Sequence, residues 1–510
     1  MRSIYLGKNT LLWILAGIVV IVAATLVLSP LVRRADPRVT GPRSGLALSE
    51  QASAGLPRYD LDLTLDPERC ELTGVLALDY VNLESVPIDA LYFYVWPNSF
   101  SSEEYAVFEG EEERAYPEGF DRGELTIESV KAGGSALSWE LVGAQKQTLR
   151  VALPEAVKPG QRARLTIGYR VTIPRCAGRF GYGEHTWSLV NAHPILAVCD
   201  DESGEWQSDY LYYSIGDPFY SDAADYTARI EVPPGYLVAA TGSQTTTRGD
   251  DAWVTTVRGP AQRDFGFVAS DDFDVVEVAA GDIMVRSWFY GSDWLGRRAA
   301  EAAAGALTVF SERFGDYCWD ELDVVMCDFY VGGMEYPGMV LIDESTYTMT
   351  TAMIMEMIVA HETAHQWWYA AVGNNQIIEP WLDEALTEFS TALYFEDRYP
   401  KDGDLLRDNY VYASYDYMET MTEISEKVAI GSPVTLFSDN IEYALVVYGR
   451  GARMFDDLRA HIGEEPFYRA LSDYYREHRF GIATGEDLIA AFSRAAGTDL
   501  TGWFSEYLNP

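Results

Sequence analysis

Positively charged residues are in short supply in this sequence. Its 510 residues include 38 Lys and Arg against 78 Asp and Glu, which gives a formal net charge of −40. Such a charge repels phosphate backbones and anionic lipid headgroups, so we expect no nucleic-acid partner. The acidity is better explained by solubility or by adaptation to high salt than by attraction of cationic substrates.

Cysteine is scarce as well. The chain has five, at positions 70, 176, 199, 318 and 327. No two of them form a Cys-x-x-Cys pair, so their spacing predicts no thiolate metal site. We expect them to be small buried hydrophobic residues. A disulfide between Cys176 and Cys199, or between Cys318 and Cys327, is the alternative if the protein lies outside the cell.

Internal repeats and low-complexity tracts are also absent from the sequence. Hydrophobic residues make up 48% of the chain and aromatic residues 13%, far from the composition of disordered chains. A length of 510 residues exceeds what one hydrophobic core usually serves. We therefore expect a globular protein of two or three domains.

One hydrophobic run stands out. After a short tail at 1–9, residues 10–32 ("TLLWILAGIVVIVAATLVLSPLV") carry no charge and could cross a bilayer as a helix. A cleaved signal peptide is the alternative, but its apolar region is normally shorter and ends in a small-x-small site. We predict a transmembrane anchor. Basic residues flank both ends of the run, so charge does not fix its orientation, and an extracytoplasmic catalytic part is our hypothesis.

The next part of the chain alternates between turns and strands. Residues 33–56 are rich in Pro, Gly, Ser and Arg without a period, which predicts a flexible linker. From Pro57 onward, runs such as "YDLDLTLDP" alternate apolar and polar residues with period two. Similar runs begin at positions 74, 161, 225 and 272. We predict a saddle-like or sandwich-like antiparallel β-sheet domain over 57–280.

The pattern changes around Trp294. Residues 294–315 ("WLGRRAAEAAAGALTVFSERFG") are alanine-rich with helical spacing, and helical signals then dominate to the end of the chain. Short strands are expected at 322–329 and 338–344. We therefore predict a second, mainly helical domain with a small sheet over 281–510, and a multidomain α+β protein.

Histidine is rare too, with six in the chain, yet two lie four residues apart in His361-Glu362-Thr363-Ala364-His365. No Pro or Gly interrupts residues 351–372, so we expect a helix there. Residues four apart share a helix face, so both imidazoles can face one metal ion. Glu362, about 100° round the helix, can reach a water on that metal but is poorly placed as a ligand. Two ordinary core histidines are the plainer interpretation, which the scarcity of histidine disfavours.

Catalytic zinc usually takes three protein ligands, so a third must come from elsewhere. A second amphipathic helix is predicted from Pro380, and Glu384 and Glu388 lie one turn apart near its apolar side. Buried carboxylates are costly unless they are paired or bind metal. One glutamate is therefore expected to bind the metal and the other to face a ligand imidazole. Spacing alone leaves a solvated glutamate at the helix edge equally open.

The motif at 361–365, followed after eighteen residues by Glu384 in "WLDEAL", resembles the gluzincin metallopeptidases. It is most similar to the thermolysin-like zinc aminopeptidases of the membrane alanyl aminopeptidase and leukotriene A-four hydrolase type. The resemblance covers residues 57–510. Three further stretches carry it: "GGMEYPGM" at 332–339, "VVYGRGA" at 446–452 and "GDPFYSDAADYTARIEVPPGYLVAATG" at 216–242.

The resemblance implies a thermolysin-like catalytic domain with one zinc ion per chain. The ligands would be His361, His365 and Glu384, with Glu388 turned toward a ligand imidazole. It also implies catalytic roles for two further residues. Glu362 would be the general base on the zinc-bound water, and the hydroxyl of Tyr448 would stabilise the tetrahedral oxyanion.

The same resemblance implies an aminopeptidase acting on peptides with a free N-terminus. The carboxylate of Glu335 would pair with the α-amino group of the substrate. Gly332, Gly333 and Met334 would lie along the peptide, which would add to the sheet as an extra strand.

Four positions depart from the family pattern. Tyr336 stands where the family commonly has asparagine, Asp383 and Ala385 alter its Asn-Glu-Gly, and Arg450 replaces lysine. These changes spare the metal ligands and the base but leave strict amine recognition open. A zinc endopeptidase, or a catalytically silent binding module on the same fold, is therefore the alternative. The sequence predicts neither the preferred N-terminal residue nor an oligomeric state.

Overall fold

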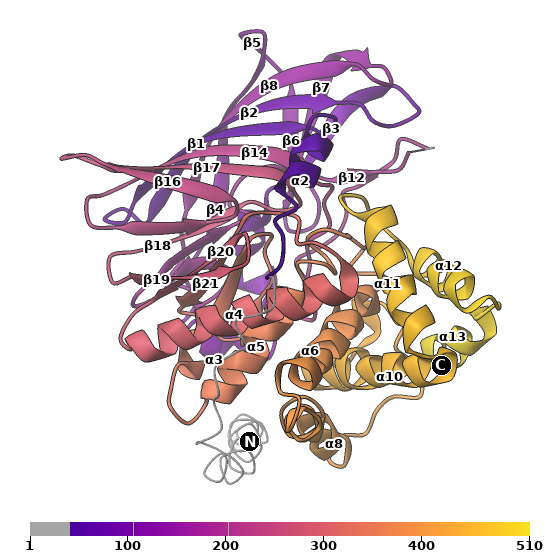
Figure 1. Ribbon diagram of the computed structural model, residues 1–510. Helices are drawn as coiled ribbons and strands as arrows, with labels where there is room; N and C mark the ends of the chain where they lie inside the picture. Colours follow the sequence, from indigo (N-terminus) through magenta and orange to yellow (C-terminus); the bar gives the residue numbers. More distant parts are fainter. Residues whose placement is uncertain (1–40, 106, 202) are drawn as a thin grey trace, which may run out of the picture.

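The computed structural model describes residues 41–105, 107–201 and 203–510. In Figure 1 the strands of the first half form the upper part of the molecule, and the helices of the second half lie below them and to the right. One hydrophobic core lies among the strands, and a second lies between the helices and a smaller sheet. The predicted order, a β-rich domain followed by a mainly helical one, is confirmed.

The largest sheet has eight strands in the order β16-β17-β14-β1-β2-β8-β4-β5. Its neighbours are antiparallel as predicted, with one exception: β1 and β14 run parallel, so the sheet is mixed. The strands are β1 (Arg58–Asp66), β2 (Glu71–Val81), β4 (Glu124–Ala132), β5 (Ser135–Ala136), β8 (Arg162–Thr172), β14 (Ala224–Val232), β16 (Ser243–Arg248) and β17 (Trp253–Gln262).

Strand β1 shows why these residues form a sheet. Its side chains alternate between exposed and buried along the whole strand, with Tyr59, Leu61, Leu63 and Leu65 facing the core. Because successive side chains in a strand point to opposite faces, this alternation places every apolar residue inside. The period-two pattern in the sequence therefore predicted both the strand and its buried face.

Two smaller sheets of four strands, β15-β18-β10-β9 and β11-β3-β7-β6, complete the N-terminal domain with a short two-stranded ribbon. Their strands are β3 (Ile88–Tyr94), β6 (Trp139–Val142), β7 (Thr148–Val157), β9 (Phe180–Tyr182), β10 (Trp187–Val190), β11 (Ile195–Leu196), β15 (Leu237–Ala240) and β18 (Gly266–Ser270). The ribbon pairs β12 (Val198–Cys199) with β13 (Trp206–Gln207).

A buried histidine lies in the core of this domain. The ring of His193 is enclosed edge-on by the aromatic rings of Tyr59, Tyr226 and Phe265. Burial lowers the pKa of this imidazole from 6.5 to about 3, because no charge compensates the protonated ring there.

Acidification should therefore destabilise the fold through His193. The unfolded chain binds a proton below pH 6.5 and the folded chain does not until about pH 3, so the stability is present above pH 6.5 and lost as the pH falls. Between pH 7.5 and 4.5 we expect a loss of about 2.7 kcal/mol from this group, at 1.36 kcal/mol per pKa unit. Urea unfolding at both pH values measures it. His193→Phe should remove that part of the loss, whereas His461→Gln at the exposed surface should not.

The second domain begins with a five-stranded sheet in the order β19-β20-β21-β23-β22. Its strands are β19 (Asp274–Ala280), β20 (Ile283–Phe289), β21 (Glu321–Cys327), β22 (Gly333–Met334) and β23 (Met339–Asp343). The predicted boundary at residue 280 falls inside the β19–β20 hairpin, whose two strands pair along their full length. The second domain therefore begins before β19, because a turn of two residues joins strands of one sheet.

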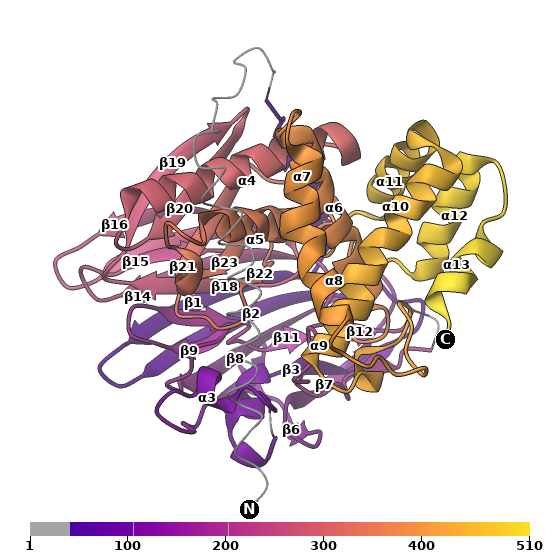
Figure 2. The same cartoon turned by 90° about the horizontal axis from the view of Figure 1, so that it is seen from below.

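Two helices cover this sheet. Helix α4 (Asp293–Phe314) packs on β19, β20 and β21, and α5 (Ala352–Ala364) packs beside it over β23 and β22 (Figures 1 and 2). Helix α6 (Glu384–Arg398) contacts α4, α5 and α10. The remaining helices are α2 (Leu46–Ser53), α3 (Glu112–Ala115), α7 (Gly403–Arg407), α8 (Ala413–Glu419), α9 (Asn440–Tyr443), α10 (Gly451–Ile462), α11 (Glu464–His478), α12 (Gly485–Ala496) and α13 (Thr501–Leu508).

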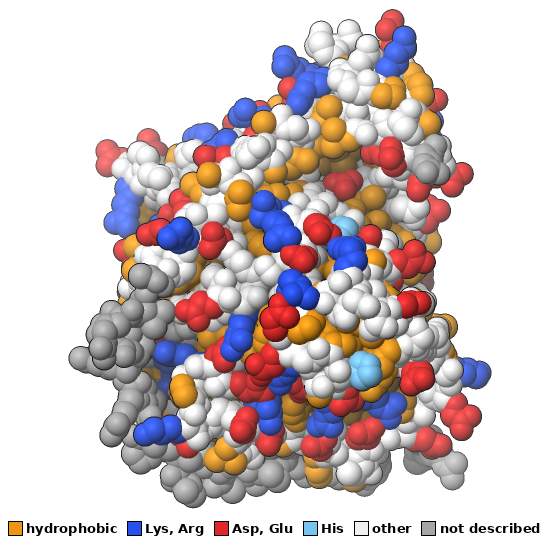
Figure 3. Space-filling view, turned by 45° about the vertical axis from the view of Figure 1, so that its right-hand side comes forward, with side chains coloured by type: hydrophobic (Ala, Val, Ile, Leu, Met, Phe, Trp, Pro, Cys, Tyr) orange, Lys and Arg blue, Asp and Glu red, His pale blue; other side chains and the backbone are white. Residues whose placement is uncertain are grey.

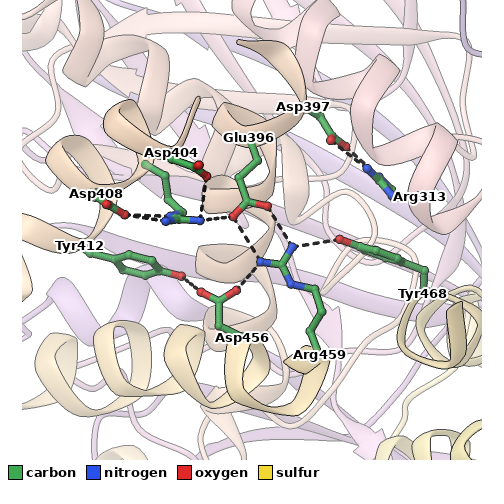
Figure 4. Close-up of polar contacts among 10 residues, drawn as sticks. Arg313, Glu396, Asp397, Asp404, Asp408, Tyr412, Asp456, Arg459 and Tyr468 are labelled. Atoms are coloured by element: carbon green, nitrogen blue, oxygen red, sulfur yellow. Dashed lines mark hydrogen bonds and ion pairs between the residues drawn. The ribbon is translucent and has the colours of Figure 1, made fainter. Parts of the chain in front are cut away.

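An ionic network holds α6 to its neighbours at the end remote from its first turn (Figure 4). The carboxylate of Glu396 accepts hydrogen bonds from Arg407 on α7 and from Arg459 on α10. Asp456 on α10 accepts from Arg459 and from the hydroxyl of Tyr412. Because the partners of Glu396 come from two other helices, the network fixes the position of the helix that also carries Glu384 and Glu388.

The segment predicted as a flexible linker is partly ordered. Within 33–56, residues 46–53 form helix α2, which packs against β17, and Gly45 donates its backbone N–H to the carbonyl of Tyr317 at 2.6 Å. This contact joins the start of the described chain to the second domain. The predicted anchor at 10–32 lies outside the described residues, and no helix within 41–510 is long and apolar enough to span a membrane.

All five cysteines are described and all carry free thiols, so neither candidate disulfide is present. Four are buried, as expected for small hydrophobic side chains. The surface is acidic but not uniformly so. On the face shown in Figure 3, Lys and Arg side chains are scattered among Asp and Glu.

Candidate metal centre and active site

Helix α5 carries the His361-to-His365 motif into the interior of the second domain. It buries Met355, Val359, Ala360 and Ala364 against the sheet and its neighbouring helices. The expected helix over 351–372 is shorter in the structure, because α5 ends at Ala364 and His365 caps it. The chain then turns, and the indole rings of Trp367 and Trp368 both lie in the core.

Two imidazoles and a carboxylate converge at this end of α5. The ring centroids of His361 and His365 lie 5.0 Å apart. The Nε2 atom of each lies 3.4 Å from Oε2 of Glu384, the first residue of α6. One ligand atom from each of the three residues lies within 4.8 Å of the others. The predicted ligand set is therefore brought together from two helices.

Each imidazole is oriented by a second contact at Nδ1. Nδ1 of His361 lies 2.8 Å from Oε2 of Glu388, one turn after Glu384 on α6. Nδ1 of His365 lies 3.1 Å from the carbonyl oxygen of Trp368 and 3.1 Å from the hydroxyl of Thr387. A proton on Nδ1 that is donated to these acceptors leaves both Nε2 lone pairs directed at one point, the arrangement that a divalent metal requires.

The chemistry of the donor set fits zinc. Oε2 of Glu384 is buried and makes no well-formed hydrogen bond with any described residue, although two imidazole nitrogens face it. Burial raises the pKa of Glu384, but the adjacent His365 and His361 outweigh it and hold that pKa well below its usual range. A buried carboxylate that stays ionised beside two imidazoles suits a cation with nitrogen and oxygen ligands, and three such ligands leave one position open.

Glu362 lies beside the candidate metal ligands and faces strand β22. Its carboxylate packs so closely on Gly333 that a Cβ atom there would lie 2.2 Å from Oε1 of Glu362. Burial raises the pKa of Glu362 to about 7, against the lowering effect of His361 and His365. A carboxylate with a pKa near neutrality can accept and release a proton at physiological pH.

Glu335 follows β22 and is buried, with 4% of its surface exposed. Its Oε1 accepts a hydrogen bond at 3.3 Å from Nε2 of Gln376, which also donates to Oδ2 of Asp383 at 2.7 Å. Burial first, and then the carboxylate of Asp217, raise the pKa of Glu335. One ligand atom each of Glu335, His365 and Asp383 lies within 4.8 Å of the other two, so this acid adjoins the candidate ligand His365.

Tyr448 also adjoins the candidate ligands and lies in a π-helical stretch at Ala444–Arg450. Its ring stacks on that of His361 with a centroid distance of 5.7 Å. Burial and then the nearby Glu384 carboxylate raise the pKa of its hydroxyl, which therefore stays protonated and able to donate. The predicted site residues His361, Glu362, His365, Glu384, Glu388, Glu335 and Tyr448 thus surround one location, together with Gly332, Gly333 and Met334.

Sequence reasoning missed the residues that connect these groups. The buried amide of Gln366 accepts the N–H of Gly338 at 2.8 Å and donates to the carbonyl of Tyr336 at 3.1 Å, which ties the Glu335 segment to the end of α5. Asn374 donates to Oδ1 of Asp383 at 2.9 Å. Asp217, from the sheet domain, pairs with Arg179 at 2.6 Å. The available signals were the adjacency of Gln366 to His365 and the place of Asp217 in the stretch at 216–242.

The departures from the family pattern have structural partners. The carboxylate of Asp383 accepts hydrogen bonds from the side-chain amides of Asn374 and Gln376, which compensate the burial of its charge. Ala385 packs on Gly451, where a Cβ would lie 2.5 Å from the Cβ of Ala385. Arg450 pairs with Glu419 at 2.7 Å. Tyr336 is buried, and its hydroxyl finds no partner within the described ranges.

Two histidines four apart, a glutamate from the next helix and a buried glutamate between the histidines define a zinc metallopeptidase of the gluzincin type. The comparison with protein families agrees: the Peptidase family M1 domain matches residues 298–507. This match covers less than half of the chain, and it supports the resemblance to zinc metallopeptidases.

Curated relatives match a part of the chain of similar size. Aminopeptidase 2 of Candida albicans is 29% identical over 220 residues, 41% of this chain and 24% of the relative. Probable aminopeptidase 1 of Saccharolobus solfataricus is 30% identical over 184 residues, 34% of this chain and 23% of the relative. The chain therefore matches about a quarter of the length of these relatives.

Solved structures match nearly the whole fold. The M1 zinc metallopeptidase from Deinococcus radiodurans has a TM-score of 0.61 at 18% identity, over 92% of this chain and 95% of that chain. A mutant of that protein bound to the substrate Tyr-Ser-Ala gives a TM-score of 0.60 at 17% identity, over 89% and 94% of the two chains. The two-domain arrangement of sheets and helices is therefore shared with a known metallopeptidase fold.

Proposed function

We propose that this chain is a zinc-dependent aminopeptidase that releases N-terminal residues from peptides. The observation that carries the proposal is the place of Glu335, a buried carboxylate in the segment after β22 that adjoins the proposed metal ligand His365. A buried carboxylate favours a cationic partner, and a free α-amino group next to the scissile bond supplies one. The names of the curated relatives, all aminopeptidases, support the same activity.

The metal would be held by His361, His365 and Glu384, with Glu388 orienting the imidazole of His361. Zinc bound there would lower the pKa of a water molecule and polarise the peptide carbonyl. Because the two imidazoles already face Glu384, little rearrangement of the side chains is needed to bind the ion.

Glu362 would accept a proton from the attacking water and deliver it to the departing amine. Its carboxylate is buried beside the ligands and faces β22, the strand along which the peptide would extend. The hydroxyl of Tyr448 would donate a hydrogen bond to the oxyanion of the tetrahedral intermediate. Gly332, Gly333 and Met334 would offer backbone groups to the substrate, and Glu335 would bind its amine.

Blocking the substrate amine tests the proposal. We expect an unmodified peptide to lose its N-terminal residue and its N-acetylated counterpart to be cleaved at least about 100-fold more slowly, because the buried Glu335 is then left without a cation. Mass spectrometry of the products measures both reactions. Equal cleavage of the two peptides would favour the endopeptidase alternative. No cleavage of either by the zinc-loaded protein would favour the silent binding module.

A second proposal concerns location and rests on the sequence. Residues 10–32 are proposed as a membrane anchor that leaves the peptidase part on the extracytoplasmic side. Protease added to intact cells should then digest residues 50–510. Full protection of the active enzyme would contradict this orientation.

A further inference from the structure

Arg263 is an arginine from the sheet domain that is buried against the second domain. It follows β17, and only 1% of its surface is exposed. Burying a guanidinium is unfavourable unless its N–H groups find acceptors, so its contacts define its role. It donates to three backbone carbonyls: Ser221 at 2.7 Å, Tyr369 at 3.0 Å and Gly481 at 2.8 Å. These carbonyls belong to the sheet domain, the turn after α5 and the loop after α11.

The turn after α5 has an uncommon backbone conformation. Tyr369 has a φ angle of 115°, a backbone conformation that residues other than glycine rarely adopt. Such conformations persist where the surrounding structure fixes them. Here the N–H of Tyr369 donates to the carbonyl of Val372 at 2.8 Å, and Ala370 donates to the carbonyl of His365 at 2.9 Å. Arg263 donates to the remaining backbone polar group of Tyr369, its carbonyl oxygen.

This turn also orients a metal ligand. The carbonyl of Trp368, which accepts from Nδ1 of His365 at 3.1 Å, belongs to the peptide group that precedes Tyr369. The φ and ψ angles of Tyr369 together set the orientation of that peptide group relative to the next one, whose carbonyl accepts from Arg263. The guanidinium of Arg263 therefore helps to fix the carbonyl of Trp368, which orients the imidazole of His365.

The fit around the guanidinium is tight. A Cβ atom on Gly373 would lie 2.2 Å from Cζ of Arg263, so the guanidinium fills the space that a side chain would need. The N–H of Gly373 donates at 3.0 Å to the carbonyl of Gly481, which also accepts from Arg263. The three segments are thus interlocked around one side chain. A shorter or apolar residue at 263 would remove the Arg263 donor from the carbonyls of Ser221 and Tyr369, whereas the carbonyl of Gly481 would keep the N–H of Gly373.

We propose that Arg263 is a positioning residue through which the sheet domain holds His365 in its metal-binding orientation. The two domains are then joined beside the proposed metal centre. The inference rests on the proposed metal site and not on aminopeptidase activity. It assigns to the sheet domain a part in metal affinity.

Zinc affinity of the full chain tests this inference. Arg263→Met should raise the Kd for zinc by about 10-fold, the lower end of the range seen when a residue that orients a metal ligand is lost. Competition with a chromophoric chelator measures this Kd. The visible absorption bands of the cobalt-substituted protein should also change, because they report ligand geometry. Arg263→Lys keeps the charge and part of the donors, so its zinc Kd should lie between those of the wild type and Arg263→Met.

Arg298 supplies the matched control. It is a largely buried arginine that donates to Glu356 on α5 at 2.7 Å, near the end of the helix remote from His365. Arg298→Met should lower the melting temperature without changing the zinc Kd or the cobalt spectrum.

The possible results separate two failures. If both Arg263 variants bind zinc as the wild type does, with an unchanged cobalt spectrum, the role of Arg263 is refuted while the metal site stands. If the wild-type protein itself binds no zinc through His361, His365 and Glu384, the proposed function fails. Should Arg263→Met not fold, Arg263→Lys decides, because an unaltered zinc Kd in the folded lysine variant also refutes the role.

Discussion

Replacing Glu362 by Gln is expected to lower kcat for peptide hydrolysis by about 10²- to 10⁴-fold, the usual contribution of a general base. The amide has almost the same shape as the carboxylate, so the contact with Gly333 and the course of α5 should be kept. It cannot take up a proton from the attacking water. KM should change little, because the groups proposed to bind the peptide are untouched.

The measurement is a steady-state assay with an aminoacyl fluorogenic amide, accompanied by the zinc content of the purified protein. Glu356→Gln is the control, since Glu356 is also a buried glutamate on α5 but accepts from Arg298 and Tyr394, away from the metal ligands. The control variant should lose stability and keep its kcat. A Glu362→Gln enzyme with one zinc ion and a wild-type turnover would rule out the proposed mechanism.

Glu384→Gln is expected to have the second large effect, the loss of the metal itself. The substitution removes the only charged ligand of three and leaves two imidazoles facing a neutral amide. We expect the variant to be purified without stoichiometric zinc and to show background activity that rises only with excess zinc.

Glu388→Gln provides the comparison on the same helix. Glu388 contacts Nδ1 of His361 rather than the point where the three ligand atoms meet, so its loss should raise the zinc Kd by about 10- to 100-fold. The effect of Glu384→Gln should be clearly larger. Equal zinc affinities in the two variants, by the same chelator competition, would show that Glu384 is not a ligand.

The fold could be predicted where a local pattern decides the structure. Strand β1 and helix α4 were predicted from period-two and helical spacing, and both appear within a residue of the expected start. The end of α5 could not be predicted in this way. Nothing local stops the helix at His365, because the turn there depends on burying Trp367 and Trp368 and on donors from distant segments.

The same division applies to the site. His361, Glu362 and His365 were predictable because helix geometry alone places four-residue neighbours on one face. Glu384 needed the resemblance, since spacing left a solvated glutamate equally open. Arg263 and Gln376 were not predictable. Arg263 reaches Tyr369 across 106 positions and Gln376 reaches Glu335 across 41, distances over which sequence spacing carries no geometric information.

The close contact between Gly333 and Glu362 limits how this enzyme can be redesigned. The segment that would read the substrate backbone and the group that would move protons share one small space. Any side chain introduced at position 333 to alter substrate preference would push the carboxylate away from the water it must deprotonate. Engineering for new peptides therefore has to keep glycine at position 333 and change residues farther from Glu362.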